Sequence, residues 1–353
     1  MTRREVGALS LALGGGALGG GVFALIGMPL PWLLGAMFTA TAAALAGLPV
    51  TMPGALRNAM LAVLGVLIGS GYTPETFERF GEWSLTLTGI AFYVVIAGGS
   101  CFLILRRLGG YDPATAFFSA MPGGLSEMVF IGRANDGDDR TIALIHSTRL
   151  LLTVTIIAAW FRASAPDGAA LVAVGAGASE VTSRDLALFL ASALAGAAAG
   201  RALRLPASFL LGPMIVTAAV HLLGWSAARP PVEITAVAQI VIGAAIGCRF
   251  AGAHAHELLR AGAAGVAVTS LLMAFTLLAT FALGAGTGLP GEVILLAFAP
   301  AGIAEMILIA LALRLDVAFI AVHHLWRLVL ILAAVPLAFR LIRAAAPSHH
   351  RDR

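Results

Sequence analysis

The chain has 353 residues, of which 59% are hydrophobic and 11% are charged, with a formal net charge of +4 and a mean hydropathy of +0.95. Because soluble domains carry roughly 25% charged residues, this composition excludes a soluble protein and indicates an all-α polytopic membrane protein whose main partner is the lipid bilayer. The basic residues are all arginine and form no dense patch, so direct nucleic-acid binding is not expected. Arg3 and Arg4 before the first apolar segment look like the start of a secretory signal, but that segment has an internal counterpart, so we expect it to be retained.

Windows of about 20 apolar residues predict six hydrophobic segments in each half of the chain. In the first half they cover residues 6–27, 31–47, 55–71, 83–105, 113–130 and 141–161. In the second half they cover residues 186–202, 206–223, 234–250, 258–283, 292–313 and 317–339. The third segments carry small residues four apart, Gly65 with Gly69 and Gly243 with Gly247, which predicts close helix packing. The predicted division of the chain is repeat 1 at 1–162, a linker at 163–184, repeat 2 at 185–345 and a cytoplasmic tail at 346–353.

Two motifs recur in the same order in both halves. Residues 121–128 read Met-Pro-Gly-Gly-Leu-Ser-Glu-Met, and residues 299–306 read Ala-Pro-Ala-Gly-Ile-Ala-Glu-Met, with Pro300 lying 178 positions after Pro122. A His-x-x-Arg motif follows each of them, and its arginine lies 22 residues after the glutamate in both halves. This conserved spacing within one chain predicts two tandem copies of one structural unit.

The relative orientation of the two halves depends on their fifth segments, which Pro122 and Pro300 interrupt. If both segments return to the side they came from, the chain has about ten crossings with two broken or re-entrant segments, and the halves are inverted. With a cytoplasmic N-terminus, this arrangement places fifteen arginines inside and five outside, whereas parallel halves give twelve against eight. The positive-inside rule therefore favours inverted halves in a bacterial inner membrane, with both termini in the cytoplasm.

The breaks themselves predict a binding site. A proline followed by glycine inside an apolar segment frees backbone groups, so we expect each break to line a cavity where protein, water or a ligand satisfies them. The half-helix after each break begins with amides whose dipole favours an anion. The candidate substrate-binding residues are Pro122, Gly123, Gly124, Ser126, Arg149, Pro300, Gly302 and Arg327. Glu127 and Glu305, in the first turn of the new half-helices, are the candidates for binding a coupling ion or proton.

Two interpretations of the buried arginines stay open. Each arginine can pair with a glutamate or with freed carbonyl groups and so tie the sixth segment to the break. Alternatively, the two breaks meet near the bilayer midplane and form one site, as in transporters with discontinuous helices, and the duplication of the whole set favours this interpretation. His146 and His324, one turn before the arginines, are accessory candidates, although a lone histidine in a membrane helix is more often a packing residue. Histidines and carboxylates lack the spacing of metal ligands, so neither a metal nor another cofactor is expected.

With these motifs, residues 6–342 resemble the AbrB duplication family of bacterial integral membrane proteins. Ala301 and Ala304 depart from the first copy of the motif and leave the second copy less polar. The resemblance implies a duplicated membrane unit. Members of this family are labelled both as ammonia monooxygenases and as AbrB-type regulators of gene expression.

The residues favour a secondary transporter of a small solute, for which the arginines suggest a negative charge, coupled to a proton or another cation. The alternative is a membrane-embedded ligand sensor that affects gene expression indirectly. A metal-dependent ammonia monooxygenase is the least favoured class, because copper ligands are missing from the motifs, and we do not expect an enzyme. The identity of the solute and the oligomeric state are left open, and a homo-oligomer is one of the allowed arrangements.

Overall fold

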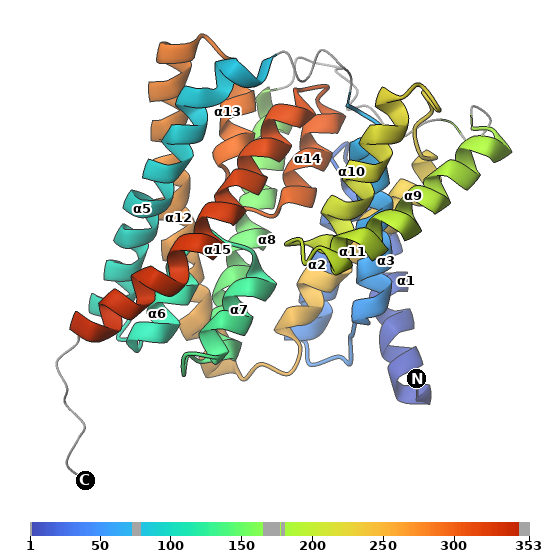
Figure 1. Ribbon diagram of the computed structural model, residues 1–353. Coiled ribbons are helices and arrows are strands. Elements are labelled where there is room, and N and C mark those ends of the chain that lie inside the picture. Colours follow the sequence, from blue (N-terminus) through green and yellow to red (C-terminus); the bar gives the residue numbers. More distant parts are fainter. Residues whose placement is uncertain (1, 73–78, 165–176, 178–180, 346–353) are drawn as a thin grey trace.

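The computed structural model describes residues 2–72, 79–164, 177 and 181–345, and this part of the chain is helical and contains no strand (Figure 1). The helices of the first half are α1 (Arg3–Leu25), α2 (Pro31–Leu45), α3 (Gly54–Gly69), η1 (Arg79–Trp83), α5 (Ser84–Arg107), α6 (Pro113–Ala120), α7 (Leu125–Arg133) and α8 (Asp139–Ser164). Those of the second half are α9 (Ser183–Ala202), α10 (Ser208–Leu222), α11 (Val232–Gly247), η3 (Cys248–Phe250), α12 (Ala255–Thr287), α13 (Gly291–Phe298), α14 (Ile303–Ala312) and α15 (Val317–Ala345).

The lengths and surfaces of the helices confirm an all-α polytopic membrane protein. Within the described residues, seven helices are long and apolar enough to cross a membrane, namely those at Arg3–Leu25, Gly81–Arg107, Asp139–Ser164, Ser183–Ala202, Val232–Phe250, Ala255–Thr287 and Val317–Arg343. Large apolar side chains such as Leu18, Phe92 and Phe281 are exposed on their outer faces. Water would penalise such a surface, whereas lipid tails match it. Most of the predicted linker and the whole predicted tail lie outside the described residues.

The helices gather into two bundles (Figure 1). We call α1, α2, α3, α9, α10 and α11, together with η3, the first bundle, and η1, α5 to α8 and α12 to α15 the second bundle. Each bundle therefore contains helices from both halves of the chain. Most contacts between helices fall within one bundle, and α8 and α14 supply much of the contact between the two. The two bundles consequently contact each other much less extensively than the helices within each bundle do.

Glycines bring the helices of the first bundle close together. A Cβ atom on Gly65 of α3 would overlap the carbonyl oxygen of Leu210 in α10, and a Cβ atom on Gly243 of α11 would overlap that of Leu33 in α2. The same relation recurs one turn later in both helix pairs. The predicted close packing is thus confirmed, and each pair joins one half of the chain to the other.

The second bundle contains the broken segments. Helix α6 ends at Ala120 and α7 begins at Leu125, and the N–H of Asp138 donates to the hydroxyl of Thr115 at 2.8 Å. Because Thr115 lies at the start of α6 and Asp138 follows α7, the chain returns to the end from which it came. Helices α13 and α14 form the corresponding pair, at the upper end of the molecule where α6 and α7 lie at the lower end (Figure 1).

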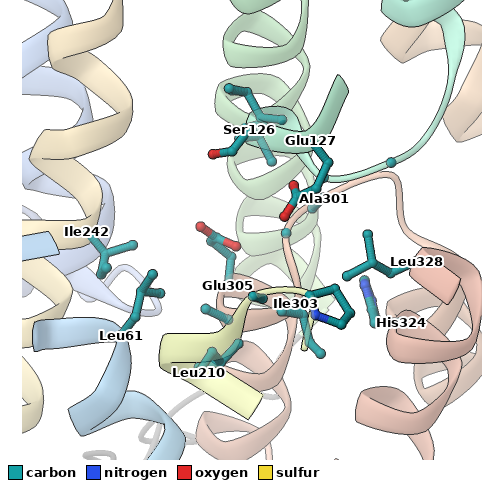
Figure 2. Close-up of a pocket in the computed structure, with 18 of the residues that line it drawn as sticks. Leu61, Ser126, Glu127, Leu210, Ile242, Ala301, Ile303, Glu305, His324 and Leu328 are labelled. Atoms are coloured by element: carbon teal, nitrogen blue, oxygen red, sulfur yellow. The ribbon is translucent and has the colours of Figure 1, made fainter. Parts of the chain in front are cut away.

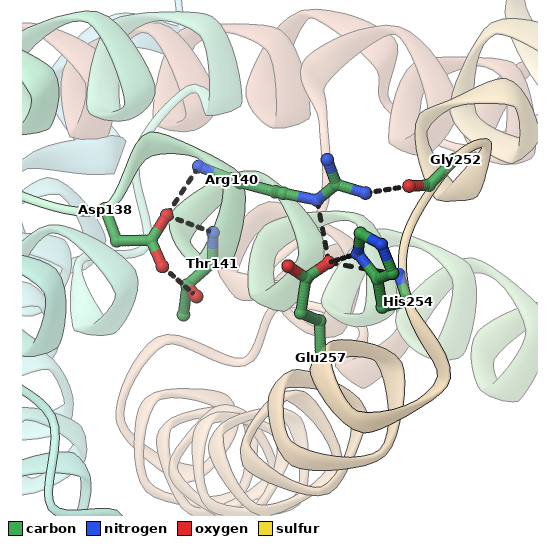
Figure 3. Close-up of polar contacts among 6 residues, drawn as sticks. All are labelled: Asp138, Arg140, Thr141, Gly252, His254 and Glu257. Atoms are coloured by element: carbon green, nitrogen blue, oxygen red, sulfur yellow. Dashed lines mark hydrogen bonds and ion pairs between the residues drawn. The ribbon is translucent and has the colours of Figure 1, made fainter.

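A polar cluster holds the start of α8 against the segment that leads from the first bundle into α12 (Figure 3). The guanidinium Nε of Arg140 lies 2.9 Å from the carboxylate of Glu257, and its Nη2 donates to the carbonyl oxygen of Gly252. Asp138 caps α8 by accepting from the N–H of Arg140 at 3.1 Å. Both partners of the ion pair are partly exposed, so its contribution to stability is on the order of 1 kcal/mol or less.

Candidate functional site

Each break is stabilised by a histidine that takes over the role of a missing N–H group. Proline has no amide hydrogen, so Pro122 cannot serve the carbonyl oxygen of Phe118 four residues earlier. His146 Nε2 lies 2.9 Å from that oxygen. In the second half, His324 Nε2 lies at the same distance from the carbonyl oxygen of Leu296, again four residues before the proline. Both histidines therefore complete the end of a broken helix.

Arg149 binds the carbonyl groups on either side of Pro122. Its Nη1 donates to Met121 at 2.9 Å and its Nη2 donates to Gly123 at 3.0 Å. The side chain is only 2% exposed, and its Nε has no partner among the described residues. These two carbonyl groups lie where the helix has ended, so the guanidinium supplies donors that the backbone cannot supply.

Arg327 makes the corresponding contacts in the second half and two more. It donates to the carbonyl oxygens of Ala299 at 2.7 Å and Ala301 at 3.0 Å, with a longer contact of 3.4 Å to Phe298. Its Nη2 also lies 2.8 Å from Nδ1 of His324. Because arginine only donates, His324 Nδ1 must accept, and the hydrogen of its ring then lies on Nε2, which faces a carbonyl oxygen. This histidine is held in its neutral form.

These contacts decide between the two kinds of partner that the sequence allowed for each arginine, a glutamate or a freed carbonyl group. In the described part of the chain, no ion pair joins Glu127 to Arg149 or Glu305 to Arg327. The arginines bind freed carbonyl groups instead, which leaves both glutamates available for other roles.

Both glutamates fold back over the glycine that precedes their half-helix. A Cβ atom on Gly302 would overlap the carboxylate of Glu305, and a Cβ atom on Gly124 would overlap that of Glu127. The φ angles of the two glycines, −76° and −64°, suit any residue, so these positions need glycine for space and not for conformation. Glu305 lies in the first turn of α14, and its side chain is 7% exposed.

The two breaks line one cavity of about 500 Å³ between the bundles (Figure 2). It brings together most of the predicted site residues, namely Pro122, Gly123, Gly124, Ser126, Glu127, Arg149, Gly302, Glu305, His324 and Arg327. Pro300 and His146 do not line it. Figure 2 shows the carboxylates of Glu127 and Glu305 directed into the same space from two different half-helices.

Two further arginines reach this cavity from the first bundle. Arg57 lies at the start of α3 and Arg249 in η3, and both line the cavity and act electrostatically on Glu305. Sequence reasoning missed them because they are not duplicated: the positions 178 residues away carry Thr235 and Gly71. The available signal is an arginine at the end of an apolar segment, a place where arginine is common and which does not by itself indicate a site.

The remaining wall of the cavity is largely apolar, with Asn58 and Ser208 as its polar members. Leu61, Leu210 and Ile242, from α3, α10 and α11, face the half-helices across the cavity (Figure 2). Four arginines and two glutamates line the cavity, so two positive charges stay in excess when both glutamates are ionised. An excess of positive charge in a site of low dielectric constant favours an anion.

These features define the class: an all-α polytopic membrane protein with two broken helices that share a charged cavity. The chain belongs to the AbrB family, since the family described as "Transition state regulatory protein AbrB" matches residues 32–343. It is 24% identical to the uncharacterized protein YhjN of Bacillus subtilis (strain 168) over 355 residues, which cover 92% of this chain and 91% of that protein. It is 26% identical over 332 residues to an Escherichia coli (strain K12) protein named as a candidate regulator, AbrB, covering 92% and 93% of the two chains. No solved structure matches the chain.

Proposed function

We propose that this protein is a secondary transporter that moves a small anionic solute through the bilayer together with a proton or another cation. The observation that carries the proposal is that two broken helices, one from each half of the chain, line a single cavity between two helix bundles. Broken helices at a shared central site are the usual way in which transporters with repeated halves hold a solute.

The arrangement of the bundles supports alternating access. Transporters of this kind expose one site to each side in turn by moving one bundle against the other. Here the bundles touch over a thin interface, and the two hairpins approach the cavity from opposite ends of the molecule (Figure 1). That arrangement agrees with inverted halves, ten crossings and two re-entrant segments in the inner membrane. The start of α1 and the end of α15 lie at the same end, in accord with two cytoplasmic termini (Figure 1).

The proposal is tested by transport in proteoliposomes. Uptake of radiolabelled carboxylates is measured with an imposed proton gradient, with a sodium gradient and with neither. We expect gradient-driven uptake by the wild-type protein, and we expect Glu305→Gln to lose the dependence on the gradient. The matched control is Glu292→Gln, which changes an exposed glutamate in the first turn of another short helix, α13, away from the cavity. Wild-type uptake that neither the proton gradient nor the sodium gradient increases contradicts a secondary transporter coupled to these ions.

The second candidate is a sensor that binds the anion in the same cavity without moving it. The observation in its favour is that the family description and one relative carry the name of a regulator. A sensor predicts saturable binding by purified protein and no uptake in vesicles that contain it. The same preparation therefore separates the two functions.

A further inference from the structure

We propose that the Glu305 carboxylate occupies the place of the substrate's own carboxylate, so that a small organic anion binds only when Glu305 takes up a proton. This inference deepens the proposed transport function and rests on it for its biological meaning. It names the substrate class, a monovalent aliphatic carboxylate, and the coupling ion, a proton.

The first argument is the position of the Glu305 side chain. Its carboxylate lies over Gly302, at the N-terminus of α14, where the amides of the first turn have no helical partners. An anionic ligand would bind at this N-terminus for the same reason that the side chain does. The side chain and a ligand carboxylate therefore compete for one place, and the glycine keeps that place open.

The second argument is the charge that surrounds this place. Arg57 and Arg249 act electrostatically on Glu305, and neither forms an ion pair among the described residues. While Glu305 is ionised, its negative charge both fills the position and neutralises part of this field. Protonation removes the charge and lets the carboxyl group turn away, so that the two arginines and the α14 amides face the cavity without the counter-charge of Glu305.

The other groups that face Glu305 do not offer the same exchange. The charged or titratable side chains that line the cavity in the described part of the chain are Arg57, Glu127, Arg149, Arg249, Glu305, His324 and Arg327. Arg149 and Arg327 are bound to backbone carbonyl groups, and His324 accepts a hydrogen bond from Arg327. Glu127 occupies the corresponding place at α7, but its side chain is more exposed than that of Glu305. We therefore assign the proton to Glu305.

The third argument concerns the rest of the ligand. Leu61, Leu210 and Ile242 form an aliphatic part of the wall opposite the half-helices, and a ligand whose carboxylate lies at α14 would place its remaining atoms against them (Figure 2). Burial of a methylene group improves binding about fourfold. A short fatty acid offers a carboxylate to the charged end of the cavity and methylene groups to its aliphatic side chains, whereas an inorganic anion can bind only at the charged end.

The exchange balances in charge. One proton bonds to a Glu305 oxygen and one monovalent anion enters the cavity, so the net charge of the loaded site equals that of the empty site. Because the loaded and the empty site carry the same charge, a complete transport cycle would move no net charge across the membrane. The proposed transport is consequently electroneutral symport of a proton and a carboxylate.

The test is isothermal titration calorimetry of purified full-length protein with butyrate, acetate and formate, each in two buffers that differ in ionisation enthalpy. We expect the wild-type protein to bind butyrate most tightly, to take up about one proton per anion, and to bind about tenfold more weakly for each pH unit above the titration of Glu305. Glu305→Gln should bind butyrate without proton uptake and with an affinity that no longer depends on pH. Glu292→Gln, which changes an exposed glutamate in the first turn of α13 away from the cavity, is the matched control and should keep the proton uptake.

Several results would overturn the proposal: no saturable binding of any of the three carboxylates, binding by the wild-type protein without proton uptake, or proton uptake that persists in Glu305→Gln. The wild-type titrations decide the first two points even if the variant does not fold. Because calorimetry measures equilibrium binding, proton-linked binding without uptake into vesicles would refute the transport function and leave this inference standing. Gradient-driven uptake without proton-linked binding would refute this inference and leave the transport function standing.

Discussion

Removal of either buried arginine should destabilise the protein, and Arg327→Ala should cost more than Arg149→Ala. Arg149→Ala leaves the carbonyl groups of Met121 and Gly123 without donors. A buried acceptor left unpaired costs about 1–3 kcal/mol, and loss of the buried charge returns part of this penalty, so we expect a net cost of about 2–4 kcal/mol. Arg327→Ala strands two carbonyl groups and also Nδ1 of His324, which should add about 1–2 kcal/mol.

The free energy of unfolding can be measured by reversible denaturation in mixed micelles with increasing sodium dodecyl sulfate. The control is Arg343→Ala, whose guanidinium is 69% exposed and lies 3.9 Å from Asp136, and which should change stability by about 0.5 kcal/mol or less. Arg→Lys at position 149 should recover only part of the loss, because one ammonium group cannot reproduce two fixed donors. If Arg149→Ala cost as little as Arg343→Ala, or more than Arg327→Ala, the assignment of these arginines to the breaks would be refuted.

Three further predictions use the same denaturation assay. His146→Leu should cost about 1–3 kcal/mol because the carbonyl oxygen of Phe118 loses its partner, and an unchanged stability would contradict this role. Gly243→Ala should destabilise the protein by about 1–3 kcal/mol because its Cβ would overlap the backbone of α2. The control is Gly262→Ala, whose Cβ meets no atom within 4 Å and which should be neutral or stabilising by up to about 1 kcal/mol. If the two variants changed the stability with the same sign and size, the packing described for Gly243 would be contradicted. Arg140→Ala should lower stability by about 1 kcal/mol or less, and a larger loss would show that the cluster in Figure 3 does more than pair two exposed charges.

The hydrophobic segments and the breaks could be predicted from the sequence because each depends on local chemistry. Apolar windows set the helices, and proline with glycine inside such a window ends a helix wherever it occurs. The exact partners of Arg149 and Arg327 could not be predicted in this way. A glutamate and a freed carbonyl group are both suitable partners for a guanidinium, and only the positions of the backbone after folding decide between them.

Arg57 and Arg249 show a different limit of sequence reasoning. Each lies at the end of an apolar segment, where arginine is common, and each counted on the cytoplasmic side in the orientation argument. Their approach to Glu305 depends on where folding places α3 and η3 relative to α14, which are distant parts of the chain. A search for duplicated residues cannot detect such a contact, because other residue types occupy the corresponding positions.

The arginines that recur in both halves of the chain and those that do not therefore have different physical roles. Arg149 and Arg327 cannot turn toward a solute without abandoning carbonyl groups that have no other donor, so their duplication reflects the cost of breaking a helix twice. Arg57 and Arg249 belong to the first bundle and are not needed as donors to the carbonyl groups of a broken helix. An anion held between them and the amides of α14 would touch both bundles at once. Displacement of one bundle would then separate its two sets of contacts, which links release of the solute to the movement that exposes it.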